Sequence, residues 1–271
     1  MLEYPEIKTI VSQMQTELIG RTVESGAMVN KNNNMFMNKD HAAKYSLLNG
    51  GVVTRIECLA PEIYIMLDNG YGILFCQCGG KILLHESEPP KNFNIIFNFT
   101  DGSSLTYTMM LFTLGIFAVS HDEWQNRVKG NQKFDPLGNN LFDDYMDFIN
   151  SRPDEETKKP VKTFLATNIS GVMSTFAAEI LLHAKVYPSV QLRKLNEEQH
   201  ERIYNSMKSV LTNAYEKGGR TNELNLYGQK GNYVAMAERK HIGENCPVCG
   251  NILGKISVGG VTAFCPKCQV K

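Results

Sequence analysis

The chain has 271 residues, of which 42% are hydrophobic and 21% charged, and its 28 Lys and Arg balance 28 Asp and Glu. It is too apolar to be disordered and long enough for one large domain or two ordinary ones. No apolar run approaches the roughly 20 residues that span a bilayer, and the first residues lack the pattern of a secretory signal. We therefore expect a globular protein of the cytoplasm with no membrane partner.

Charge is divided unevenly along the chain. Residues 1–150 hold 11 Lys and Arg against 17 Asp and Glu (11 − 17 = −6), and residues 151–271 hold 17 against 11 (17 − 11 = +6). A basic C-terminal half suits a polyanionic partner, whereas the neutral total argues against strong nonspecific affinity for DNA.

The first half of the chain reads as one helix followed by β-strands. Apolar residues at spacings of three and four predict a helix over 2–19, which Gly20 ends. Short runs of β-branched and aromatic residues follow, separated by turns such as Asp68-Asn69-Gly70; these runs lie at 52–58, 63–67, 72–76, 82–85, 93–99 and 104–110. We expect a mostly antiparallel sandwich or barrel in a domain over 1–130.

The second half reads as helical. Helices are predicted over 143–149, 162–166, 177–183 and 197–217, and Pro188 marks the turn between the last two. Residues 221–241 are polar and contain Gly228 and Gly231, which predicts a long mobile loop. We therefore place a helical domain over 131–240.

The last segment, 241–271, carries a metal-binding pattern. Two Cys-x-x-Cys pairs are separated by fifteen residues, and they comprise Cys246, Cys249, Cys265 and Cys268. Each pair can form a knuckle offering two thiolates, and the intervening stretch brings the knuckles together around one zinc ion. Four cysteines leave no open coordination position, so the zinc is predicted to be structural. The other cysteines, Cys58, Cys76 and Cys78, are expected to be free thiols in a reducing compartment.

Three motifs, in order, resemble the formamidopyrimidine-DNA glycosylase / endonuclease VIII family: the start Glu3-Tyr4-Pro5-Glu6, the helical block from Ile169 to Pro188, and the ending Cys265 to Gln269. The resemblance spans essentially the whole chain. It implies an α+β architecture with an N-terminal helix on a β-sandwich, then a helix-two-turn-helix and a C-terminal zinc β-hairpin. In the family, these two parts grip DNA across the interdomain cleft.

The resemblance also implies a chemistry. Family members excise oxidised bases and cut the resulting abasic site; an N-terminal amine attacks the sugar C1′ to form a Schiff base, and the adjacent glutamate acts as an acid. It places Met1, Glu3 and Glu6 at catalytic positions. The family normally has a proline at position two, exposed by removal of the initiator methionine. Leu2 is bulky, which predicts that Met1 is retained. A structural role for Glu3, at the N-terminus of the first helix, remains an alternative.

Several other family positions differ in this sequence. Pro61 stands where the family has a phosphate-binding lysine, and Cys78 where it has the methionine that fills the gap left by the flipped base. Ser174 replaces the asparagine of the phosphate clamp, and Gly260 replaces the arginine of the zinc hairpin. Each loss removes a contact of roughly 1–3 kcal/mol.

We interpret the chain as a DNA-binding protein of this base-excision-repair family that binds damaged DNA in the interdomain cleft. The candidate nucleic-acid contacts are Lys81, Ser174, Lys185, Arg193 and Lys194. Whether the protein is an enzyme stays open: an active member would be a glycosylase and abasic-site lyase, using the Met1 amine or hydrolysis through Glu3. The alternative is a catalytically inactive relative that binds structured DNA, RNA or a protein partner.

Overall fold

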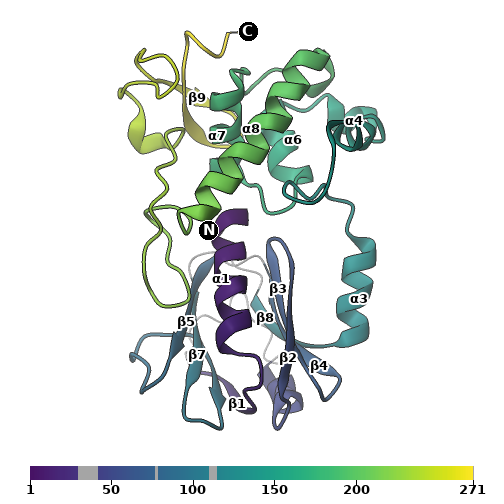
Figure 1. Ribbon diagram of the computed structural model, residues 1–271, viewed down its shortest axis with the longest axis vertical. Coiled ribbons are helices and arrows are strands. Elements are labelled where there is room, and N and C mark those ends of the chain that lie inside the picture. Colours follow the sequence, from purple (N-terminus) through teal and green to yellow (C-terminus); the bar gives the residue numbers. More distant parts are fainter. Residues whose placement is uncertain (30–41, 77–78, 110–114, 271) are drawn as a thin grey trace. The chain divides into compact units, whose positions relative to one another are not determined.

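The computed structural model describes residues 1–29, 42–76, 79–109 and 115–270. The chain forms two compact units (Figure 1). Unit 1 comprises Met1–Asn131 and Gly218–Asn232, and unit 2 comprises Gln132–Lys217 and Tyr233–Lys271. Unit 1 combines a helix with two sheets, and unit 2 combines helices with a β-hairpin, so the α+β class is confirmed.

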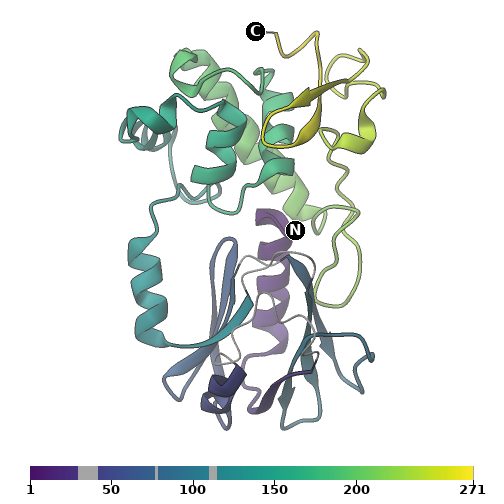
Figure 2. The same ribbon diagram turned by 180° about the vertical axis from the view of Figure 1, so that it is seen from behind.

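Unit 1 contains two antiparallel four-stranded sheets with the strand orders β1-β6-β7-β5 and β2-β3-β4-β8 (Figures 1 and 2). The unit begins with helix α1 (Tyr4–Glu17) and ends its first segment with helix α3 (His121–Gly130). Its strands are β1 (Val23–Met28), β2 (Val53–Leu59), β3 (Glu62–Leu67), β4 (Tyr71–Cys76), β5 (Gly80–His85), β6 (Ile95–Phe99), β7 (Ser104–Met109) and β8 (Gly115–Ser120), and a 3-10 turn, η1 (Lys44–Leu48), follows β1.

The two sheets pack face to face through aromatic side chains. The rings of Phe75 on β4 and Tyr107 on β7 lie 6.2 Å apart, centre to centre, in an edge-on contact. Tyr45 of η1 packs on Phe97 of β6 at 5.2 Å, and its hydroxyl donates to the carbonyl oxygen of Ile116 on β8 at 2.9 Å. These contacts join the sheets in one core, as the predicted sandwich requires.

Sequence patterns did not reveal three elements of unit 1. Strands β1 and β8 were not predicted, because β1 is half exposed and the sequence from the end of β7 into β8 is apolar except for Thr113 and Gly115, without a clear turn signal. Helix α3 has a single buried residue, Trp124, and therefore shows no amphipathic period. It begins at the capping box of Ser120 and Glu123, in which each residue's side chain accepts the other's backbone N–H.

Unit 2 contains five α-helices, a β-hairpin and two 3-10 turns among its described residues. The helices are α4 (Phe142–Asn150), α5 (Asp154–Thr157), α6 (Val161–Asn168), α7 (Ser174–Ala184) and α8 (Glu197–Glu216), the 3-10 turns are η2 (Leu192–Lys194) and η3 (Arg239–His241), and the hairpin consists of β9 (Gly254–Ser257) and β10 (Val261–Phe264). Helix α7 buries eight of its eleven residues, so it forms the centre of the unit. Helices α6 and α7 match the predicted helix-two-turn-helix.

The position of residues 218–232 in the structure differs from the domain boundaries expected from the sequence. They were predicted to belong to a helical domain over 131–240, within a mobile loop, but they belong to unit 1. Leu226 is fully buried there, its backbone N–H bonds the Gln13 side chain of α1, and its carbonyl oxygen accepts from Leu84 of β5. The low apolar content of the segment concealed these contacts, because most of them are polar.

His200 of α8 gives unit 2 a predictable dependence on pH. Its side chain is buried, and Nδ1 has no hydrogen-bond partner among the described residues. Burial lowers the pKa of His200 from its ordinary 6.5. As pH falls below 6.5, the unfolded chain takes up a proton that the folded chain does not, so the free energy of unfolding falls by up to about 1.4 kcal/mol per pH unit.

Replacing His200 by Phe is expected to flatten this dependence. Urea unfolding of wild type and His200→Phe at pH values of about 7.5 and 5.5 measures it. An unchanged pH slope in the variant would show that other groups, such as His85 with its similarly lowered pKa, control acid stability.

No helix in the described part of the chain is both long and apolar enough to cross a membrane.

Candidate zinc centre and N-terminal cluster

The four predicted metal ligands lie together at the base of the β9–β10 hairpin. The sulfur atoms of Cys246, Cys249, Cys265 and Cys268 all lie within 4.8 Å of one another. Tetrahedral coordination with zinc–sulfur bonds of about 2.3 Å requires sulfur separations of about 3.8 Å, so the cluster fits one zinc ion. Backbone N–H groups support two of the sulfurs: Val248 donates to Cys246 at 3.4 Å and Cys268 donates to Cys265 at 3.3 Å.

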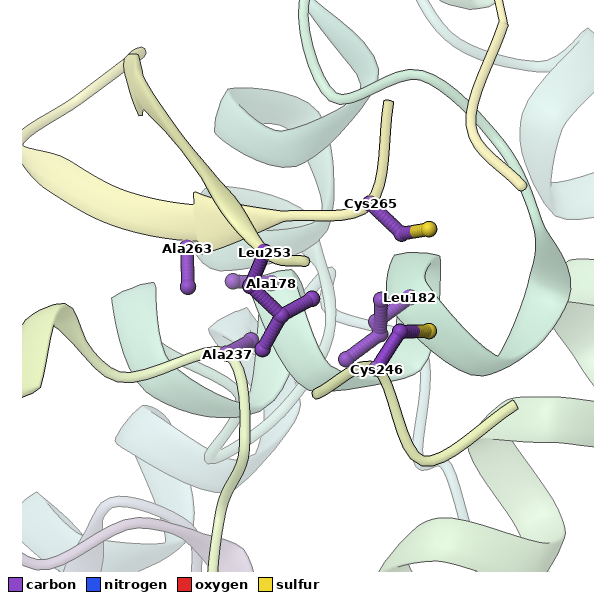
Figure 3. Packing of buried hydrophobic residues seen from close by; sticks show 7 residues of the cluster. All are labelled: Ala178, Leu182, Ala237, Cys246, Leu253, Ala263 and Cys265. Carbon is purple, nitrogen blue, oxygen red and sulfur yellow. The ribbon is translucent and has the colours of Figure 1, made fainter. Parts of the chain in front are cut away.

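The hairpin packs on α7 through a small hydrophobic cluster. Ala178 and Leu182 of α7 meet Leu253 and Ala263 of the hairpin region, and Ala237 completes the contact (Figure 3). Cys246 and Cys265 belong to the same cluster and are buried. Three of the seven buried residues are alanines and two are the cysteines, so the cluster buries limited apolar area and we expect the hairpin to depend on its metal for stability.

Lys162 connects the tip of the hairpin to the helix-two-turn-helix. Its side chain is 2% exposed, and Nζ donates to the Val258 carbonyl oxygen at 2.8 Å and to Ser174 Oγ at 3.0 Å. Ser174 Oγ in turn donates to the Gly259 carbonyl oxygen at 3.4 Å. A buried ammonium group with these acceptors fixes the turn of the hairpin beside the start of α7.

Replacing Lys162 by Met is expected to loosen the hairpin tip while the zinc remains bound. Loss of the charge-assisted hydrogen bonds should lower the unfolding free energy by about 1–3 kcal/mol. Amide exchange over β9 and β10 should accelerate in the variant relative to wild type. Lys159→Met, which removes an exposed lysine just before α6, is the control and should leave that exchange unchanged.

A second cluster forms around the N-terminus in unit 1. Glu3 immediately precedes α1 and Glu6 lies in its first turn, and both are almost fully buried. The backbone N–H of Glu3 donates to Glu6 Oε2 at 2.9 Å, so the two residues begin the helix together. Buried carboxylates require a buried cation or several donors, and Arg220 supplies both.

Arg220, which is 4% exposed, binds Glu6 through its side chain and its backbone. Nε donates to Glu6 Oε1 and Nη2 to Glu6 Oε2, each at 3.0 Å, and the Arg220 backbone N–H donates to Oε1 at 2.9 Å. Nη1 lies 3.5 Å from Glu3 Oε1. Burial alone would lower the pKa of Arg220, but the carboxylates of Glu6 and Glu3 outweigh that effect and raise it.

Met1 is held by the same loop. Arg220 Nη2 donates to the Met1 carbonyl oxygen at 2.9 Å, and the terminal ammonium group forms an ion pair with Glu223 at 3.1 Å. Gly219 permits this arrangement: its φ is +90°, and an added Cβ would lie 2.7 Å from Glu6 Cγ. The backbone of the first residue is therefore tied to this polar cluster, while the residue as a whole is 58% exposed.

The structure also locates the candidate nucleic-acid contacts. Lys81 is exposed on β5, Lys185 is exposed directly after α7 with a positive φ of 57°, and Lys194 is exposed in η2. Arg193 is engaged with Asp154 at 3.6 Å, and Ser174 is bonded to Lys162. Pro61 precedes β3, and Cys78 lies outside the described residues.

Arg220 and Lys162 were not among the candidate residues. The signal for Arg220 was indirect, because two glutamates beside the apolar residues of a buried helix need a cation that the sequence pattern cannot locate. Lys162 lies in the helix predicted over 162–166, and no local pattern indicates the contacts that its side chain makes.

Family models and curated relatives both connect this chain with formamidopyrimidine-DNA glycosylases. The family model for the formamidopyrimidine-DNA glycosylase N-terminal domain matches residues 1–110, and the model described as a zinc finger found in FPG and IleRS matches residues 243–270. The chain is 28% identical to a formamidopyrimidine-DNA glycosylase of Lactobacillus helveticus (100% of this chain and 99% of the relative), and 26% identical to one of Bacillus cereus (99% of each).

Solved structures share the fold. MutM (Fpg) of Thermus thermophilus aligns with a TM-score of 0.80 at 22% identity, covering 98% of each chain. The Lactococcus lactis Fpg in complex with DNA that contains an abasic site aligns with a TM-score of 0.83 at 20% identity, covering 99% of this chain and 100% of that one.

Fold and site together define a class of α+β proteins that combine a helix-led β-sandwich with a helix-two-turn-helix and a four-cysteine zinc hairpin. The chain belongs to the formamidopyrimidine-DNA glycosylase / endonuclease VIII family. Cys246, Cys249, Cys265 and Cys268 form its structural zinc site.

Proposed function

We propose that this protein binds damaged DNA, as a base-excision-repair protein of the cytoplasm, and that its N-terminus does not form a Schiff base with the sugar. The first part rests on the family and on solved relatives: Lactococcus lactis Fpg has been solved in complex with DNA that contains an abasic site or Fapy-dG. The second part rests on the residues around Met1.

DNA binding is supported by the way unit 2 is built. The zinc cluster and Lys162 fix the hairpin against the helix-two-turn-helix, so a surface for the nucleic-acid backbone exists before any ligand arrives. Lys185 and Lys194 are exposed in this unit and Lys81 is exposed in unit 1, which leaves their ammonium groups accessible to phosphate.

The observation that carries the chemical part is the ion pair of the terminal amine. The amine nitrogen lies 3.1 Å from a carboxylate oxygen of Glu223, and it must leave this carboxylate before it can attack C1′. The Met1 carbonyl oxygen also accepts from Arg220, so moving the whole residue would break a hydrogen bond of the guanidinium group that holds the buried Glu6. Glu3 and Glu6 then serve chiefly to hold Arg220 and the start of α1.

A binding titration tests the first part. A duplex that contains a tetrahydrofuran abasic analogue, a matched undamaged duplex and a single-stranded RNA are titrated between about 50 and 200 mM salt. We expect saturable binding that weakens steeply with salt and is tightest for the damaged duplex. Failure to bind either duplex at the lowest salt would refute DNA binding, and tighter binding of the RNA would point to the inactive RNA-binding alternative.

A further inference from the structure

We propose that Arg239, assisted by Lys240, forms a phosphate-binding site for the DNA backbone beside the start of α7. The site was not among the candidates from the sequence. This inference rests on the proposed function, because it assigns part of the DNA contact to two residues of unit 2.

The backbone just before η3 is held firmly in place. Glu179 of α7 is 1% exposed, and its carboxylate accepts the Ala237 backbone N–H at 2.8 Å and the Tyr233 hydroxyl at 3.1 Å. The Ala237 carbonyl oxygen accepts the backbone N–H of Ala263 on β10 at 2.9 Å and the hydroxyl of Thr262. The segment is therefore bonded to both α7 and the hairpin.

The other end of η3 is fixed as well. His241 is 9% exposed, and its Nδ1 lies 2.8 Å from a carboxylate oxygen of Glu244. Arg239 and Lys240 thus project from a short turn that is anchored on both sides, and both side chains are exposed. Cations on a fixed backbone lose less conformational entropy when they bind than cations on a free loop do.

A depression of about 250 Å³ lies directly beside these cations. Its lining includes Ser174 and Thr175 at the start of α7, Val261 and Thr262 of β10, and Arg239 and Lys240 themselves. The hairpin tip next to it consists of Gly259 and Gly260, which have no side chains to cover the opening; a Cβ on Gly260 would lie 4.0 Å from Ser174 Oγ. The depression has room for a phosphate group.

The ionised side chains that line the depression carry a net positive charge, which favours an anionic ligand. Glu238 also lines the depression, and it pairs with Lys240 at 2.8 Å, so the three ionised side chains sum to +1. Arg239 has no acidic partner within the described part of the chain. A guanidinium group presents paired donors that match two oxygens of a phosphodiester, so Arg239 is the main contact and Lys240 adds charge.

The test compares salt dependence between charge-matched variants. Arg239→Ala/Lys240→Ala is compared with Arg55→Ala/Lys91→Ala, which removes the same charge from exposed positions of unit 1. On the abasic-analogue duplex, the first variant should make the negative slope of log K against log salt shallower by roughly 1–2. It should also weaken binding on the order of tenfold or more at low salt. The control variant should keep the wild-type slope.

Three outcomes are distinguishable, once zinc content and circular dichroism show that both variants are folded. A reduced slope in the Arg239 variant alone supports the inference. A wild-type slope in that variant, with intact DNA binding by the wild-type protein, overturns the inference and leaves the proposed function standing. Absence of DNA binding by the wild-type protein overturns both.

Arg239→Lys tests the geometry of the contact. This variant keeps the charge but loses the paired donors, so binding should fall several-fold while the slope stays near the wild-type value. Unchanged affinity in Arg239→Lys would mean that only charge matters at this position.

Discussion

Replacing Cys246 by Ser is expected to abolish zinc binding and to unfold the C-terminal hairpin. Thiolates supply all four predicted ligands, and structural zinc contributes roughly 10–16 kcal/mol of binding free energy in zinc-finger peptides. The small residues that join the hairpin to α7 cannot replace a contribution of that size. Helices α6 to α8 should persist because they have a core of their own, so DNA binding should be lost while most helical content remains.

Metal analysis, far-ultraviolet circular dichroism and the duplex titration measure these three effects. Cys58→Ser is the matched control, because Cys58 lies on β2 and outside the sulfur cluster; it should retain one zinc per chain and wild-type affinity. A Cys246→Ser protein that kept both its zinc and its DNA affinity would contradict the structural role of the metal.

Replacing Arg220 by Met is expected to destabilise unit 1 by about 3–5 kcal/mol, since Glu3 and Glu6 would remain buried without their cation. Methionine keeps much of the apolar volume, so the loss reports mainly on charge. The added substitution Glu6→Gln should restore part of the stability, because it removes one of the unpaired carboxylates. Urea unfolding of the single and double variants measures both effects.

Arg55→Met is the control for this series. Its side chain is 71% exposed and pairs only with Glu57 at 3.3 Å among the ion pairs of the described residues, so its removal should change stability by less than about 1 kcal/mol. If Arg220→Met also changed the free energy of unfolding by less than about 1 kcal/mol, the N-terminal cluster would not contribute significantly to the stability of unit 1.

The sequence was sufficient to predict those parts of the structure whose signals are local. The period of α1 and the turns between β2 and β7 follow from neighbouring residues, and the spacing of the cysteines predicts the zinc site. Strand β1 was missed because its exposed residues do not alternate clearly, and α3 was missed because only Trp124 is buried. Residues 218–232 were assigned to the wrong part of the chain because polar contacts hold them.

The N-terminal site was predictable only in part. The sequence pointed to Glu3 and Glu6, while the retention of Met1 and the roles of all three residues in DNA chemistry remain predictions. Arg220 could not be found by pattern, since it is more than 200 positions away from its partners. Contacts at that separation depend on how the whole unit folds, and no local spacing encodes them.

Borohydride trapping on a duplex with a natural abasic site shows directly whether this protein binds damaged DNA while its terminal amine stays in an ion pair. Each sample is divided: one half measures binding by gel shift, and the other is reduced and separated under denaturing conditions. We predict a shifted complex without a covalent adduct. A reduced protein–DNA adduct, mapped by mass spectrometry to the Met1 amine, would show instead that the amine leaves Glu223 and attacks the sugar.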